Sequence, residues 1–140
     1  MNELQEVENQ EQSVAGIRVL IVDDSSVMRK IVERSLRQTE LVMEMVYEAA
    51  NGSEALDLLA SKQVQLILSD INMPSMDGLE FLRQLRARGL AAGVPVVMIT
   101  TESSEEHVKQ AIQAGAQGYI RKPFTAEQVK ERVLPLVGQA

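Results

Sequence analysis

Short runs of apolar residues alternate along this chain with longer stretches in which apolar residues recur every three or four positions. The short runs, which are typical of buried strands, occupy residues 17–22, 42–49, 64–70, 94–100 and 118–122. An amphipathic, helix-like stretch follows each of them. Short apolar strands alternating with amphipathic helices form parallel sheets that are covered on both faces. The pattern therefore predicts an α/β fold, a (βα)5 doubly wound five-stranded parallel sheet.

The predicted helices have recognisable ends. A side chain that accepts a hydrogen bond from the first turn stabilises a helix start, and a Ser/Thr residue three positions before Glu/Gln does so reciprocally. Such signals occur at Ser25 or Ser26, at Asn51, at Ser103–Glu106 and at Thr125–Gln128. Gly115 and Pro135 are expected to end the last two helices. Helical periodicity turns Ile31 and Ile112 toward the core.

Composition narrows the classes of function. Hydrophobic residues make up 45% and charged residues 24%, which is ordinary for a globular domain. Cysteine is absent and His107 is the one histidine, which excludes disulfide frameworks, zinc–thiolate sites and polyhistidine metal sites. Aromatic residues are only 3%, so a stacking platform for single-stranded nucleic acid is not expected.

Charge is concentrated at the start of the chain. The net charge is −6, and residues 1–16 hold four acidic residues and no basic one. We interpret residues 1–16 as an acidic, flexible N-terminal tail and residues 17–138 as one folded domain. The nearly neutral remainder predicts no nucleic-acid partner. With no signal-peptide pattern and no membrane-length apolar stretch, we expect a cytoplasmic protein that does not bind membranes, and a monomer.

Chemically active side chains follow four of the five predicted strands. They are Asp23 and Asp24 after the first strand, Asp70 after the third, Thr100 after the fourth and Lys122 after the fifth. The carboxyl ends of parallel strands meet at one edge of a sheet, so these groups should converge. Three nearby carboxylates need a compensating cation, which Lys122 and a hard divalent ion such as Mg²⁺ would supply. A carboxylate in that setting can attack phosphorus and form an aspartyl phosphate.

Each of these residues also has an ordinary structural interpretation. Asp23 or Asp24 would serve as a helix cap, Asp70 as a turn residue, Thr100 as a strand end and Lys122 as a surface charge. Their joint arrival at the ends of four strands favours the functional interpretation.

Four segments carry a family resemblance: VLIVDDSSVMRKIV, LILSDINMPSMDGLEFL, VVMITTES and AGAQGYIRKPF. Together they resemble the receiver domain of bacterial two-component response regulators, over about residues 17–138. The chain is most similar to stand-alone, chemotaxis-type receivers, because no output domain follows. The resemblance implies the flavodoxin-like receiver topology. The key motif positions hold their usual residue types, so an active receiver is expected.

The resemblance also implies a role for individual residues. Asp70 would be the phosphoacceptor, and Mg²⁺ would be held by Asp23, Asp24, Asp70 and the backbone carbonyl of Asn72. Thr100 and Lys122 would bind the phosphate, and Tyr119 would be the switch aromatic. The Lys122–Pro123 bond is expected to be cis. Asn72 and Glu102 would tune dephosphorylation, and the candidates for the partner face are Val108, Tyr119 and Arg121.

The implied function is that of a phosphorylation-activated signalling protein. A sensor histidine kinase would donate the phosphoryl group to Asp70 with Mg²⁺ present. The face made by the fourth helix, fifth strand and fifth helix would then bind a target such as the flagellar motor switch, in chemotaxis signalling. A phosphatase is a further candidate partner. The chain would catalyse its own phosphorylation and dephosphorylation, and we do not expect an enzyme that turns over a substrate.

Other functions stay open at this point. A phosphorelay or phosphate-sink receiver would pass its phosphoryl group to a histidine phosphotransfer protein, and target capture with a phosphoryl mimic would separate this role from motor binding. A phosphohydrolase acting on small phosphate esters would share the acidic site, although the chain lacks an obvious lid and a second general acid. A nucleotide- or flavin-binding protein is disfavoured, because the acidic first turn, Asp23 to Ser26, has no glycine.

Overall fold

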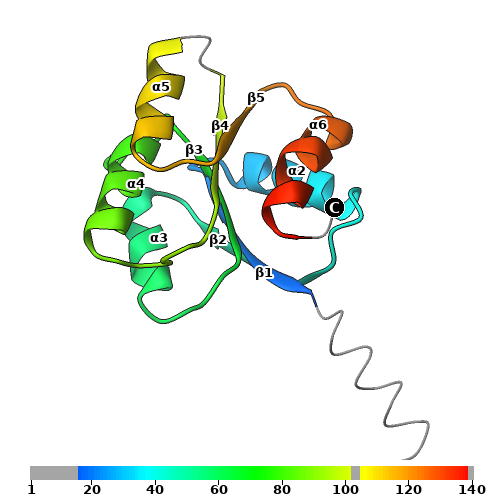
Figure 1. The fold of residues 1–140 in the computed structure, drawn as a ribbon, viewed down its shortest axis with the longest axis horizontal. Coiled ribbons are helices and arrows are strands. Elements are labelled where there is room, and N and C mark those ends of the chain that lie inside the picture. The colour runs from blue at the N-terminus through cyan, green and yellow to red at the C-terminus, as the bar shows by residue number, and fades with distance from the viewer. Residues whose placement is uncertain (1–15, 102–104, 139–140) are drawn as a thin grey trace, which may run out of the picture.

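A five-stranded parallel sheet forms the centre of the molecule (Figure 1). The computed structural model describes residues 16–101 and 105–138. The strands are β1 (Ile17–Val22), β2 (Met43–Ala49), β3 (Leu66–Asp70), β4 (Val96–Thr100) and β5 (Gly118–Arg121). Their order in the sheet is β2-β1-β3-β4-β5, and every neighbouring pair is parallel. The predicted doubly wound (βα)5 fold is confirmed.

Helices cover both faces of this sheet (Figure 1). One face carries α2 (Ser26–Arg37) and α6 (Ala126–Val133), which continues into a short 3-10 turn at Leu134–Leu136. The other face carries α3 (Gly52–Leu59), α4 (Gly78–Ala87) and α5 (Glu105–Gln113). Within the described residues, no helix is long and apolar enough to cross a bilayer.

Alternate residues of each central strand enter two separate cores. In β1, Leu20 and Val22 pack beneath α3, α4 and α5, whereas Val19 and Ile21 pack beneath α2 and α6. Successive side chains of a strand point to opposite faces, and helices bury both faces here. Central strands must therefore be apolar at every position, which explains the unbroken apolar runs in the sequence.

Most helix ends lie where the sequence places them. Ser25 and Asn51 cap α2 and α3, and Thr125 forms the predicted capping box with Gln128 at the start of α6. Gly115, at a φ of 109°, follows the end of α5, and α6 gives way to the 3-10 turn that contains Pro135. The predicted Ser103–Glu106 box lies partly outside the described residues, as does nearly all of the predicted tail.

Some sequence predictions need correction. Four strands are one or two residues shorter than predicted, and β4 begins at Val96 because Pro95 has no N–H to donate to the ladder. Ile31 and Ile112 are 42% and 48% exposed, whereas their spacing predicted buried positions. Val32 and Ala111 are the residues that fill the core at these places. Periodicity locates a helical face only to within about one residue, and packing decides its rotation.

Candidate functional site

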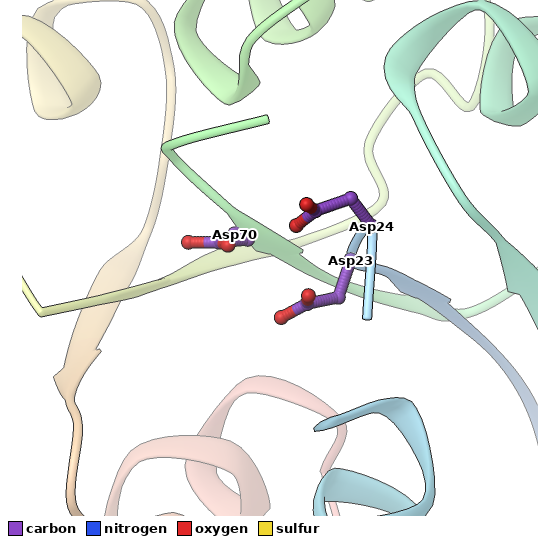
Figure 2. A group of neighbouring side chains, drawn as sticks. All are labelled: Asp23, Asp24 and Asp70. Atoms are coloured by element: carbon purple, nitrogen blue, oxygen red, sulfur yellow. The ribbon is translucent and has the colours of Figure 1, made fainter. Parts of the chain in front are cut away.

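Three carboxylates meet at the carboxyl edge of the sheet. Asp23 follows β1 directly, Asp24 comes next, and Asp70 is the last residue of β3. Because β1 and β3 are neighbours and Val22 pairs with Ser69, the two strand ends lie side by side. One oxygen from each carboxylate lies within 4.8 Å of the others. Figure 2 shows the three side chains projecting to the same side from these two strand ends.

Lys122 supplies the positive charge of the site from beyond the end of β5. Its Nζ lies 3.2 Å from Oδ2 of Asp23 and 3.5 Å from Oδ2 of Asp70. The Lys122 side chain is 14% exposed, and those of Asp23 and Asp70 are 4% and 9% exposed. Little water screens these charges, so their mutual attraction and repulsion are strong. One ammonium between two carboxylates, with Asp24 close by, leaves the site negative.

The protonation of Asp70 reflects opposing influences. Burial, which disfavours the ionised carboxylate, raises the pKa of Asp70, and the neighbouring Asp23 charge raises it further. Lys122 and the backbone N–H of Asn72 act in the opposite direction and lower this pKa. A second cation at the site would favour the ionised form in the same way as Lys122 does.

Backbone contacts hold the two buried carboxylates in place. The N–H of Ser25 donates to Oδ1 of Asp23 at 2.9 Å, and the N–H of Asn72 approaches Oδ1 of Asp70 at 3.4 Å. Gly78, the first residue of α4, donates its N–H to the carbonyl of Ile71 at 2.7 Å. A Cβ at Gly78 would lie 2.2 Å from the Asp70 carbonyl oxygen. The loop after β3 therefore closes back tightly on the end of that strand.

The donor set suits a hard divalent cation. Three carboxylates within reach of one another are the ligand type that Mg²⁺ and Ca²⁺ prefer, and sulfur and imidazole ligands are absent from this cluster. Both carboxylate oxygens of Asp23 already accept hydrogen bonds, from Ser25 and Lys122. The exposed Asp24 is therefore the carboxylate best suited to direct coordination.

The remaining predicted residues are distributed around this centre. Thr100 ends β4, the strand next to β3, and is fully buried, while Asn72 is exposed in the loop that follows Asp70. The Lys122–Pro123 peptide bond is cis. Glu102 lies outside the described residues, so its predicted role is not addressed.

The residues predicted for a partner face lie on α5 and β5. Tyr119 is half-buried in the edge strand β5, and the guanidinium of Arg132 in α6 lies 5.7 Å from the centre of its ring. Val108 is half-buried on α5, and Arg121 is exposed at the end of β5. A groove of about 470 Å³ runs between β5 and α6, and Tyr119, Arg121 and Arg132 contribute to its walls.

Sequence reasoning missed two charged residues next to the acidic cluster. Arg29 of α2 contacts the backbone of Asp23 and the side chain of Glu48 in β2. Arg29 and Glu48 are 19 residues apart and belong to different elements. No local pattern links them, and the helical spacing of Arg29 indicates only a polar position.

A doubly wound sheet with an acidic rim and a lysine across it is the architecture of a receiver domain, and this chain belongs to that family. A model of the response regulator receiver domain matches residues 19–134. The more specific likeness is to chemotaxis proteins. The chain is 41% identical over 123 residues to a chemotaxis protein CheY homolog of Campylobacter jejuni, covering 87% of this chain and 93% of the relative.

Solved structures show the same likeness. The chemotaxis response regulator CheY4 of Vibrio cholerae superimposes with a TM-score of 0.77 at 34% identity, covering 87% of this chain and 99% of that one. The receiver domain of the Francisella response regulator 1452 gives a TM-score of 0.76 at 25% identity, covering 89% and 98%.

Proposed function

We propose that this chain is a phosphorylation-activated, chemotaxis-type receiver that accepts a phosphoryl group on Asp70. The observation that carries the proposal is the placement of Asp70 at a strand end, 3.5 Å from the Lys122 ammonium and beside the carboxylates of Asp23 and Asp24. An aspartate that served only as a turn residue would need neither a half-buried lysine beside it nor two neighbouring acids. Membership of the receiver family supports the same assignment.

The chemistry is an in-line displacement at phosphorus. A carboxylate oxygen of Asp70 attacks the phosphorus of a phosphohistidine in the donor kinase. The new O–P bond forms as the N–P bond breaks, and the imidazole leaves with the electron pair of that bond. Hydrolysis later returns the carboxylate and inorganic phosphate when water attacks the same phosphorus. The chain thus assists its own modification and its reversal, without turnover of a separate substrate.

The side chains of the site divide the electrostatic work. Lys122, which already contacts Asp70, neutralises charge on the phosphoryl oxygens as the transfer proceeds. Mg²⁺ would be held by Asp24 and Asp70, with the Asn72 carbonyl as a further candidate ligand. Asp23, whose carboxylate already accepts hydrogen bonds, would act on the ion indirectly. When bound, Mg²⁺ supplies the positive charge that lets an anionic carboxylate meet an anionic phosphoryl group. The Thr100 hydroxyl would bond to the phosphate of the product.

Phosphorylation would change the surface formed by α5, β5 and α6, which we call the α5–β5–α6 face. Val108, Tyr119 and Arg121 belong to the elements of this face. Movement of Thr100 toward the phosphate would vacate space into which the ring of Tyr119 turns, and the groove beside Arg132 would change shape. We infer that a histidine kinase donates the phosphoryl group and that the activated chain binds a chemotaxis target such as the motor switch. Both steps would take place in the cytoplasm. The chemotaxis relatives favour this output over a phosphate-sink role.

The test is the mass of the intact protein after incubation with acetyl phosphate and Mg²⁺. We expect one added phosphoryl group, about 80 Da, on the wild type, and none with Asp70→Asn or with EDTA. Asp57→Asn, on the exposed side of α3, is the matched control and should be modified like the wild type.

Two outcomes would contradict the proposal. Modification of Asp70→Asn to the wild-type extent would place the phosphoryl group elsewhere. An unmodified wild type that also fails to bind beryllofluoride, a stable phosphoryl mimic, would remove phosphorylation from the function of this chain. Rapid, repeated hydrolysis of small phosphate esters would instead support a phosphohydrolase.

A further inference from the structure

A half-buried arginine contacts the backbone of the acidic pair. Nη1 of Arg29 donates a hydrogen bond to the carbonyl oxygen of Asp23 at 2.6 Å, and its Nε donates to Oε1 of Glu48 at 2.8 Å. The side chain of Arg29 is only 16% exposed, and that of Glu48 is 27% exposed. One guanidinium therefore joins three elements: its own helix α2, the turn after β1 and the edge strand β2.

The contacts around this arginine are mutually supporting. Lys30 pairs with the second oxygen of Glu48 at 2.8 Å, and Ala49, the next residue, accepts a hydrogen bond from the N–H of Asp23 at 3.1 Å. Hydrogen bonds from Lys30 and, to a smaller degree, Arg29 lower the pKa of Glu48, which keeps this partner ionised. The end of β2 thus binds the backbone of Asp23 in two ways. Ala49 accepts the hydrogen bond of the Asp23 N–H, and Glu48 holds Arg29, which in turn binds the Asp23 carbonyl oxygen.

The carbonyl that Arg29 binds belongs to the peptide unit between Asp23 and Asp24. A peptide unit is planar, so fixing its oxygen fixes the direction in which the chain enters Asp24. Figure 2 shows the Asp24 carboxylate turned toward Asp70 across the end of the sheet. Rotation of that peptide unit would swing this carboxylate away.

We propose that Arg29, held by Glu48, is a positioning residue for the cation site: it orients the Asp23–Asp24 peptide unit and thereby aims the Asp24 carboxylate at Asp70. The inference rests on the proposed function, because it assumes that these carboxylates hold Mg²⁺. It adds a residue that makes no contact with the cation or the phosphoryl group.

Charge and geometry predict opposite effects when Arg29 is removed. A guanidinium near a cation site repels the cation, so its charge alone would weaken Mg²⁺ binding and a neutral replacement would strengthen it. If Arg29 acts by orienting the peptide unit, the same replacement weakens binding. The sign of the change in affinity therefore separates the two roles.

The experiment measures Mg²⁺ affinity directly, by calorimetric titration of the unphosphorylated full chain. We expect Arg29→Met to raise the dissociation constant about tenfold, as is typical when a group that orients metal ligands is lost. Arg29→Lys keeps the positive charge and should destabilise the fold less than Arg29→Met does. An ammonium, however, lacks the planar guanidinium that donates to Asp23 and Glu48 at the same time. This variant should also bind Mg²⁺ more weakly than the wild type.

Two control variants isolate the contact with Asp23. Lys30→Met removes the other partner of Glu48 without touching the Asp23 carbonyl, and Arg18→Met breaks the 3.1 Å pair with Glu44 at the opposite end of the same two strands. Both should keep the wild-type affinity. Urea unfolding in the absence of Mg²⁺ checks that each variant is fully folded under the conditions of the titration.

The outcomes distinguish this inference from the proposed function. If the wild type binds Mg²⁺ and either Arg29 variant binds it equally or more tightly, the positioning role is wrong while the phosphoacceptor site stands. If the wild type itself does not bind Mg²⁺, both proposals fail together. Equal weakening in Lys30→Met would also overturn the inference, because it would trace the effect to charge around Glu48.

Discussion

At the scale of single residues, Asp70 shows how a fold can make the ionised form of a carboxylate unfavourable. Burial and the Asp23 charge make ionisation of Asp70 unfavourable, and Lys122 offsets only part of that cost. A carboxylate in this position gains from any added positive charge, so a bound cation would relieve a repulsion that folding creates. The same imbalance makes Asp70 a source of instability in the unliganded chain.

The first prediction concerns this imbalance. The native pKa of Asp70 is raised, so between its ordinary pKa and the native pKa the folded state binds more protons than the unfolded state. The contribution of Asp70 to stability is therefore present at low pH and is lost as the pH rises through the native pKa. Asp70→Asn cannot ionise, and without Mg²⁺ it should be more stable than the wild type at pH 7, with the difference shrinking as the pH falls from the native pKa toward the ordinary one.

Urea unfolding at a series of pH values measures the difference between the two proteins. Asp57→Asn, which removes an exposed carboxylate from α3, is the control for the loss of one negative charge. A variant Asp70→Asn that is less stable than the wild type at pH 7 would mean that the ion pair with Lys122 outweighs the burial of the carboxylate.

At the scale of elements, the loop between β3 and α4 is the tightest part of the site. Gly78 begins α4 immediately after its cap, Asp77, which accepts a hydrogen bond from the N–H of Glu80. The same glycine leaves room for only a hydrogen atom against the Asp70 backbone. The start of the helix and the position of Asp70 are therefore set by one contact.

Gly78→Ala tests this contact. Its methyl group would lie 2.2 Å from the Asp70 carbonyl oxygen and 2.8 Å from Cα of Ile71, so the loop must shift. We expect a loss of about 1–3 kcal/mol in the free energy of unfolding, the usual cost of overpacking, and slower phosphorylation by acetyl phosphate. Gly118→Ala is the matched control, because a Cβ there meets no atom within 4 Å, and it should stay within about 0.5 kcal/mol of the wild type. Equal effects in the two variants would show that the close approach at Gly78 is unimportant.

The elements also show what a sequence can and cannot predict. The apolar runs predict all five strands, and the Thr125–Gln128 box predicts the start of α6, because both depend on local chemistry. The grouping of Asp23, Asp70 and Lys122 follows once a parallel sheet is assumed, since strand ends must share an edge.

Features that depend on tertiary packing were not predicted from the sequence. The exposure of Ile31 and Ile112 depends on how each helix is rotated on the sheet. The pair between Arg29 and Glu48 requires the register of β2 beside β1, which local patterns do not contain.

At the scale of the whole molecule, the acidic edge of the sheet is formed by the ends of strands that also build both hydrophobic cores. The strands β1, β3 and β4 contribute alternate residues to each core. Asp23 follows the end of β1, and β3 and β4 end at Asp70 and Thr100. A cation bound at the edge therefore ties together strand ends from the centre of the sheet. Its binding free energy should be measurable as stability of the entire domain.

The last prediction is that Mg²⁺ stabilises the chain against urea. At a concentration one hundred times its dissociation constant, a ligand that binds only the folded state adds about 2.7 kcal/mol to the free energy of unfolding. Asp24→Asn should lose most of this gain, since Asp24 is the exposed carboxylate of the cluster. Sodium chloride at matched ionic strength controls for screening. An equal gain in Asp24→Asn would locate the stabilising ions elsewhere on the surface.

The loop between α4 and β4 lies at the opposite edge of the sheet, where α4 ends and β4 begins. Gly89 and Gly93 both adopt positive φ there, and each faces open space. The turn is thus separated by the full length of the strands from the carboxylates, and it has room for added chain. For work in living cells, this loop is the natural insertion point for a fluorescent reporter or an affinity tag, because cargo placed there would leave the acidic edge of the sheet open.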